Sequence, residues 1–278
     1  AIEWLETHEG AEAIWVPVDH EGVVDFEWYR NFLAEHNEEI ALVTFMLANN
    51  ETGVITELEK FLVLAKTHEI PSHSDAVAAF GHLPIDFPAL GLSTMAISAH
   101  KVGGPVGVGA LLVSRSTKIT SLIQGGGQER GIRSGTLNAA GAKAFAFAAN
   151  LALKNMDAEN QHTRKLVEQI KETVMQQVSG ARFSRGNQLG LAHNAHFTFE
   201  GAKSDSLLFL LDQAGFAASA GSACQAGVAR PSHVLLAMGR TEAEANGSLR
   251  FTLNQNTSAN DVADLLAKLP DIVLTARA

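Results

Sequence analysis

Short apolar runs alternate with segments of helical spacing along the first half of the chain. Strand-forming residues gather in four runs, at 13–18, 40–46, 92–98 and 108–114. Between these runs, segments 25–36 and 57–68 carry apolar residues at helical intervals, and Asp25 is suited to cap the first of them. This order predicts an α/β fold, in which helices flank a sheet.

The pattern changes after residue 135. An Ala-rich segment predicts a helix over 136–156, a charged segment predicts a second helix over 157–178, and strands are expected near 195–200 and 248–253. We therefore expect two domains, a large one over residues 1–155 and a smaller C-terminal α+β domain over residues 156–278.

Bulk composition limits the function classes. The chain has 278 residues, 46% of them hydrophobic, and a formal net charge of −9 without a basic block. These features favour a globular protein with a sizeable core, and they exclude a typical nucleic-acid-binding surface or a membrane span. The single cysteine, Cys224, rules out an intramolecular disulfide and suits a reducing, cytoplasmic compartment.

The first ten residues predict a short helix that lacks a preceding cap and ends near Gly10. No basic region followed by a long apolar stretch precedes the first strand-like run, so a signal peptide is not indicated. We expect that an N-terminal segment precedes this sequence in the whole protein.

Four local patterns carry side chains suited to chemistry, and each also has an ordinary structural interpretation. Lys101 lies in the Gly-rich stretch SAHKVGGPVGVGALLV, where it is either a surface lysine or an amine held for covalent chemistry. Asp75 is either a cap or a ligand-binding carboxylate at the end of a strand. GGGQERGIRSGT, in which Thr136 opens the predicted helix, is either an interdomain loop or a phosphate site. Cys224 is either an inert buried thiol or a reactive one, on a loop followed by a helix that starts at Pro231.

The order of these patterns resembles the cysteine desulfurases of the class V aminotransferase group, which are pyridoxal 5′-phosphate enzymes of fold type I. The resemblance covers essentially the whole chain. Its motifs are NNETG (49–53), HSDA (73–76), SAHKVGGPVGVGAL (98–111), GGGQERGIRSGT (125–136), SAGSAC (219–224) and LRFTL (249–253). It implies a mixed, mostly parallel sheet in a large cofactor-binding domain.

The resemblance also implies a role for each motif residue. Lys101 would hold the cofactor as an imine and later move protons, with His100 beside it, and Asp75 would keep the pyridine nitrogen protonated. The remaining implied ligands are Ser98 and His100 for the cofactor phosphate, Thr136 for the phosphate of a neighbouring subunit, Asn50 for cofactor or substrate, and Arg250 for the substrate carboxylate. Cys224 would take the sulfur of L-cysteine as a persulfide, leaving L-alanine. No metal is implied.

The implied activity is removal of sulfur from L-cysteine for iron–sulfur cluster assembly or tRNA thiolation. The implied partners are a second copy of the chain and a sulfur-acceptor protein, such as an iron–sulfur scaffold or a thiolation enzyme. Ala78 departs from the family, because a glutamine usually bonds the phenolic oxygen of the cofactor there. Two alternatives stay open: a related lyase or transaminase acting on selenocysteine or cysteine sulfinate, and a cofactor-poor, non-catalytic form.

Overall fold

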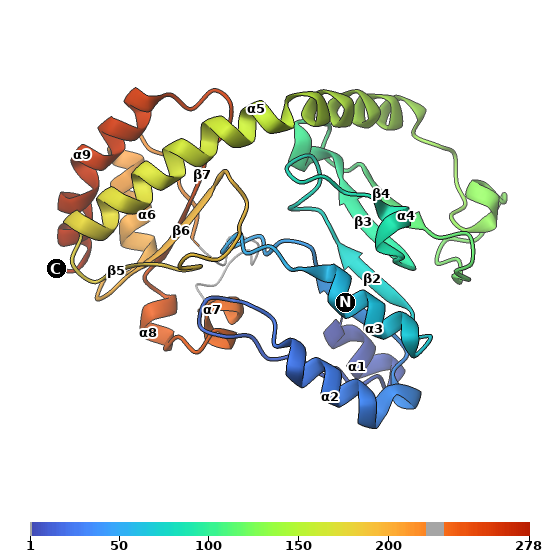
Figure 1. Cartoon of the computed structure of the whole chain (residues 1–278). Coiled ribbons are helices and arrows are strands. Elements are labelled where there is room, and N and C mark those ends of the chain that lie inside the picture. The colour runs from blue at the N-terminus through green and yellow to red at the C-terminus, as the bar shows by residue number, and fades with distance from the viewer. Residues whose placement is uncertain (1, 221–230) are drawn as a thin grey trace.

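The structure is a computed structural model that describes residues 2–220 and 231–278. Two sheets lie side by side beneath one long helix, α5, which runs across both of them (Figure 1). The helices are α1 (Ile2–Glu9), α2 (Phe26–His36), α3 (Leu58–Thr67), α4 (Phe87–Leu90), α5 (Ala139–Gln177), α6 (Ser204–Gln213), α7 (His233–Ala237), α8 (Glu242–Ala245) and α9 (Ala259–Ala276). Short 3₁₀ helices are η1 (Asn37–Glu39), η2 (Ala99–Val102) and η3 (Glu129–Gly131).

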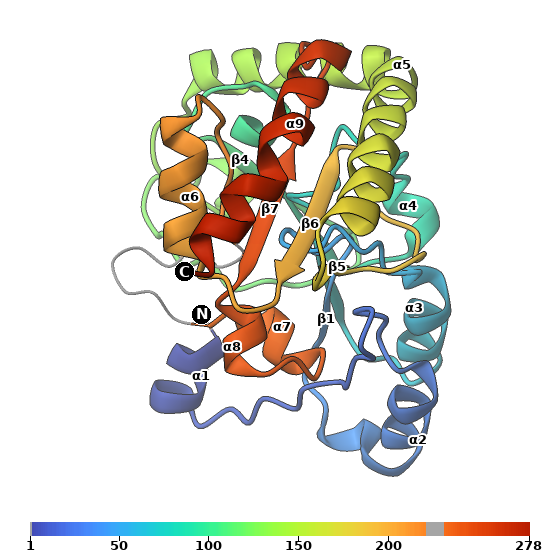
Figure 2. The same cartoon turned by 90° about the vertical axis from the view of Figure 1, so that its left-hand side faces the viewer.

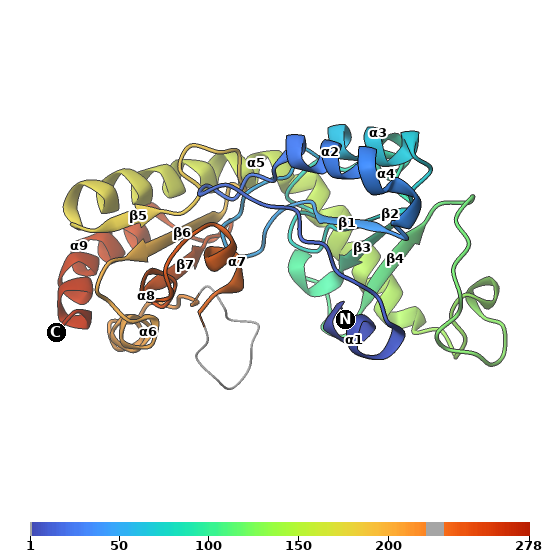
Figure 3. The same cartoon turned by 90° about the horizontal axis from the view of Figure 1, so that it is seen from below.

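The first sheet is mixed and mostly parallel, as expected. Its strands are β1 (Val43–Met46), β2 (Ser72–Asp75), β3 (Thr94–Ser98) and β4 (Gly109–Val113), in the order β1-β2-β3-β4. The first three run parallel, and β4 runs antiparallel to β3. Helices α2, α3 and α4 lie on one side of this sheet (Figure 3), where apolar side chains of α2 and α3 form a core with β1.

The second sheet is antiparallel, with the order β5-β6-β7. Its strands are β5 (Ala181–Phe183), β6 (Asn194–Phe199) and β7 (Ser248–Thr252). Helices α5, α6 and α9 cover this sheet (Figure 2), and every residue of β6 is buried. The core beneath these helices therefore belongs to the C-terminal part of the chain and is separate from the first.

Three local expectations are wrong. Residues 13–18 form no regular strand: Pro17 offers no N–H to a ladder, Trp15 is 71% exposed, and only Val18 bridges to Val24. The helices expected over 136–156 and 157–178 are one 39-residue helix, because no proline or glycine interrupts the junction. Helix starts also shift by a few residues. Asn138, not Thr136, caps α5, and Ser232 caps α7, which leaves Pro231 outside the helix.

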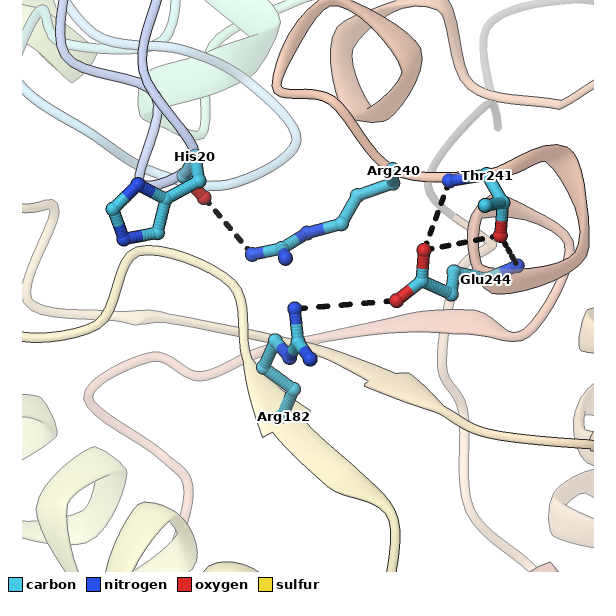
Figure 4. Close-up of polar contacts among 5 residues, drawn as sticks. All are labelled: His20, Arg182, Arg240, Thr241 and Glu244. Carbon is cyan, nitrogen blue, oxygen red and sulfur yellow. Dashed lines mark hydrogen bonds and ion pairs between the residues drawn. The ribbon is translucent and has the colours of Figure 1, made fainter.

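The segment that follows α1 crosses to the C-terminal part of the molecule. There the Arg240 guanidinium donates to the backbone carbonyl of His20 at 2.9 Å (Figure 4). Beside it, Glu244 and Thr241 form a capping box at the start of α8, and Arg182 lies 3.9 Å from the Glu244 carboxylate. These contacts join the N-terminal and C-terminal segments on the side of the molecule away from α5.

Candidate active site

Lys101 lies in a tight turn directly after β3. The turn is η2, and Gly103 ends it with a left-handed backbone (φ 77°). The N–H of Gly104 then bonds the Ala99 carbonyl at 2.9 Å, and a β-carbon at Gly104 would lie only 2.9 Å from that oxygen. The glycines after Lys101 are therefore required by the turn, which buries Ala99 and leaves the lysine side chain exposed.

Asp75, Ser98 and His100 lie at the same edge of the sheet as Lys101, because the parallel strands β2 and β3 end there. One Asp75 carboxylate oxygen accepts the Val77 N–H at 2.8 Å, so Asp75 orders the turn after β2 and does not cap a helix. Ser98 Oγ and His100 Nδ1 are hydrogen-bonded at 2.7 Å. The edge thus combines a half-buried carboxylate, a hydroxyl and an imidazole.

Arg250 reaches the same edge from the second sheet. It lies in β7, and its guanidinium donates to the Asn50 carbonyl at 2.6 Å. Arg250 Nε is buried and finds no hydrogen-bond partner among the described residues. The Asn49 side chain shapes the Asn50 turn by accepting the N–H groups of Glu51 and Thr52, both at 2.9 Å. One arm of the guanidinium is therefore tethered, while a second donor stays unpaired.

Asn50, Lys101 and Arg250 line one cavity of about 380 Å³. Ala78 adds a methyl group to its wall and cannot supply a hydrogen bond. The other lining residues are Gly81, His82, Val102, Gly103, Leu151, Ala152, Asn155, Glu159, Leu191, His193, Asn194, Thr252, Leu253, Asn254, Gln255 and Asn256. The cavity thus joins an exposed amine from the first sheet to a guanidinium from the second, which suits a bound carboxylate beside a reactive amine.

Two histidines of the cavity wall were missed by sequence reasoning. The rings of His82 and His193 lie 4.1 Å apart between centroids. Burial lowers the pKa of His193 to about 3 and also lowers the pKa of His82, so neither carries charge near neutral pH. The stretch FGHLPID contained His82, but no spacing rule marks a histidine that meets its partner across 111 residues of sequence.

Glu51 is a second missed residue. It is 4% exposed, and Ser232, which caps α7, donates to its carboxylate. Burial raises the pKa of Glu51, while this hydrogen bond and the charges of His233 and Arg250 act against the rise. Glu51 therefore links the turn that holds Arg250 to the start of α7.

Not every predicted site residue lines the cavity: Asp75, Ser98 and His100 lie at the sheet edge, outside its lining. Thr136 is exposed, lies between β4 and α5 in the chain, and does not line the cavity. Cys224 lies outside the described residues. The described segment before it ends beside β7, because Ser219 and Arg250 form two backbone hydrogen bonds, of 2.7 and 3.0 Å.

Comparison with known proteins shows the family of the chain. The sequence profile of the family Aminotransferase class-V matches residues 1–265. The chain belongs to this family. It is 44% identical over its whole length to an IscS-like cysteine desulfurase of Mycobacterium tuberculosis, of which it spans 70%. It is 37% identical over 271 residues to the cysteine desulfurase IscS of Clostridium botulinum, covering 97% of this chain and 68% of that one.

Solved structures agree. A NifS-like protein matches 99% of this chain and 71% of its own at a TM-score of 0.88 and 31% identity. The NifS-like protein of Rickettsia africae ESF-5 covers 92% of this chain and 68% of its own at a TM-score of 0.84 and 31% identity. These findings confirm the predicted family, the enzyme class and pyridoxal 5′-phosphate as the cofactor.

The residues at the sheet edge fit this cofactor. Asp75 has one carboxylate oxygen engaged by Val77, and no hydrogen bond occupies the other among residues 2–220 and 231–278. Lys101 forms no ion pair within the same residues, so its amine is available. Ala78 lines the cavity with a methyl group, where the family resemblance implies a side-chain donor to the cofactor.

Proposed function

We propose that this chain is a cysteine desulfurase that removes the sulfur of L-cysteine, leaving L-alanine and a persulfide on Cys224. In this step the bond between the β-carbon and the sulfur of the substrate breaks, and a sulfur–sulfur bond forms at Cys224. The β-carbon takes up a proton, which gives L-alanine. Family membership supports the chemistry. The observation that carries the assignment of residues is the shared cavity of Lys101, Asn50 and Arg250.

Each side chain has a separate task in this proposal. The cofactor, when bound, supplies the electron sink that weakens the bonds at the substrate α-carbon. Lys101 would anchor it covalently and would carry a proton to and from the α-carbon. Asp75 would pair with the pyridine nitrogen and keep it protonated, and Ser98 and His100 would hold the phosphate. These roles of Lys101, Asp75, Ser98 and His100 are proposals. They are supported by the position of all four residues at one edge of the first sheet.

Arg250 orients the substrate. Its planar fork matches a carboxylate, and the tether to the Asn50 carbonyl fixes the plane of the guanidinium before substrate arrives. Because Ser219 pairs with the Arg250 backbone, the described chain enters the Cys224 segment next to the residue that binds the substrate carboxylate. This proximity supports Cys224 as the sulfur acceptor.

We also propose a homodimer in which Thr136 serves the phosphate of the neighbouring subunit. Exposed apolar side chains before and after Thr136 in the chain support an interface: Leu122 is 98%, Leu137 54% and Phe147 72% exposed. From this dimer the persulfide would pass to an acceptor protein, either an iron–sulfur scaffold or a thiolation enzyme. Within the described residues no helix is long and apolar enough to cross a membrane. The cytoplasmic location stays a prediction, as does the division into domains at residue 155, which lies within α5.

The test follows one sulfur atom. After incubation with L-cysteine, intact-mass measurement of the cofactor-loaded chain should show one added sulfur on Cys224, together with L-alanine in solution. Cys224→Ser should retain the cofactor but show neither product. Alanine formation with an unmodified Cys224 would contradict the proposal and favour the related lyase.

A further inference from the structure

A second cavity lies beside the second sheet. It measures about 320 Å³ and opens between α5 and the loop that joins β5 to β6. Its charged lining residues are Arg164, Glu168 and Lys171 of α5 and Arg185 of the loop; the others are Phe183, Gly186, Asn187, Gln188, Leu189 and Gly190. Since none of these residues lines the Lys101 cavity, the two cavities are separate.

Arg185 is the unusual member of this group. Only 5% of its surface is exposed, yet the described residues place no carboxylate within ion-pair distance of it. Its one hydrogen bond runs from Nη1 to the Leu191 carbonyl at 3.0 Å, and its guanidinium lies 5.1 Å from the centre of the Phe183 ring. A buried guanidinium normally has an anionic partner, because desolvation of an unpaired charge is costly.

The backbone around Arg185 leaves room for its side chain in this position. A β-carbon at Gly190 would overlap the guanidinium, and one at Gly53 would lie 3.1 Å from Nη1. Burial lowers the pKa of Arg185 to about 10, which still leaves the side chain charged at neutral pH. The close approach of the Gly190 and Gly53 backbone therefore holds the Arg185 guanidinium beside the cavity.

The Glu168 carboxylate acts on Arg185 and offsets part of the effect of burial on its pKa, but it lies beyond ion-pair distance from the guanidinium. Lys171 lies 3.8 Å from Glu168 and donates to the Asn187 side chain at 3.1 Å. Arg164 is exposed and forms no ion pair within the described residues. The Glu21 carboxylate near the loop accepts from Gln188 at 2.6 Å and does not line the cavity. The lining thus holds three cations and one carboxylate.

We propose that this cavity binds a phosphate group, either as inorganic phosphate or as part of a small phosphomonoester. Two guanidinium groups and an ammonium group line the cavity, and such cationic N–H donors are the groups that recognise phosphate. The volume, at the lower end of ligand-binding pockets, favours a small ligand.

Titration calorimetry tests this on the chain loaded with pyridoxal 5′-phosphate, so that the cofactor phosphate site is already filled. Inorganic phosphate and glycerol 3-phosphate serve as separate probes of the two sources. We expect saturable binding of at least one probe. Arg164→Gln should weaken binding about tenfold, and Arg185→Met should abolish it. The matched control is Lys165→Gln, an exposed position next to Arg164 on α5 that does not line the cavity.

Arg164→Gln should fold normally, since its side chain is exposed, so it keeps the test informative if Arg185→Met misfolds. It should also leave persulfide formation unchanged, which separates this site from the catalytic one. Absence of saturable binding for both probes would overturn the proposal, and so would equal weakening by Lys165→Gln and Arg164→Gln.

Discussion

The Lys101 cavity and the projecting segment, residues 114–138, are built in opposite ways. In the cavity, residues far apart in sequence meet, and the Asn50 carbonyl and Arg250 guanidinium are bonded across 200 positions. The projecting segment is ordered mainly by its own short-range bonds, such as Gln128 to Gly135 at 2.9 Å, and it leaves Thr136 exposed. Under the proposed function, the amine anchor and the carboxylate clamp come from one chain, whereas Thr136 would act on a second chain.

The largest expected effect tests the self-contained cavity. Lys101→Ala should lose the covalent cofactor and bring alanine formation below detection, because the described cavity offers no other lysine. Borohydride reduction followed by peptide mapping measures the attachment directly. A cofactor found on another lysine would show that the wrong turn has been assigned.

A smaller effect is expected at the clamp. Arg250→Lys should lower kcat/KM for L-cysteine by roughly ten- to a hundredfold, since one ammonium group cannot both hold the Asn50 carbonyl and bind a carboxylate bidentately. The loss should fall mainly on KM, and cofactor absorbance should stay unchanged. Lys165→Gln on α5 is the control, and an unchanged KM for Arg250→Lys would remove Arg250 from the substrate site.

Mixed dimers test whether Thr136 acts on its own chain or on the neighbouring chain. If Thr136 serves the partner, a dimer of one Lys101→Ala chain and one Thr136→Ala chain keeps one intact site of two, and activity at limiting cofactor should recover to about half. If Thr136 serves its own chain, no site is intact. Differently tagged chains, co-purified and assayed at limiting cofactor, distinguish these results.

The last prediction concerns the pH dependence of stability and leaves catalysis aside. Burial lowers the pKa of His196 to about 3, from 6.5, so the unfolded chain binds an extra proton between these values. Stability should therefore fall as the pH drops below about 6.5, with His196 contributing a slope of about 1.4 kcal/mol per pH unit. Urea unfolding from pH 7 to 4 measures it. His196→Asn should flatten the slope, whereas His20→Gln, at an exposed ring, should not.

Sequence patterns predicted the α/β order, most strands and the Lys101 turn, because periodicity and glycine spacing are local properties. Local pattern could not show that 136–178 is one helix, since alanine-rich and charged stretches are both good helix formers. It also overrated residues 13–18, where apolar side chains find no neighbouring strand and Trp15 stays exposed. The pair His82 and His193 and the bond between Glu51 and Ser232 join distant segments, and such contacts depend on how the two sheets dock.

Helix α5 gives the Lys101 turn an indirect dependence on the far end of the molecule. The helix is about 58 Å long by its residue count. Its C-terminal half is held by buried Ile170 and Val174, whereas its N-terminal half lies over η2 with little more than Phe145 and Ala148 buried. We therefore expect that loosening the core under α5, α6 and α9 also loosens η2. Val174→Ala should speed amide hydrogen exchange at Lys101, although Val174 does not line the cavity.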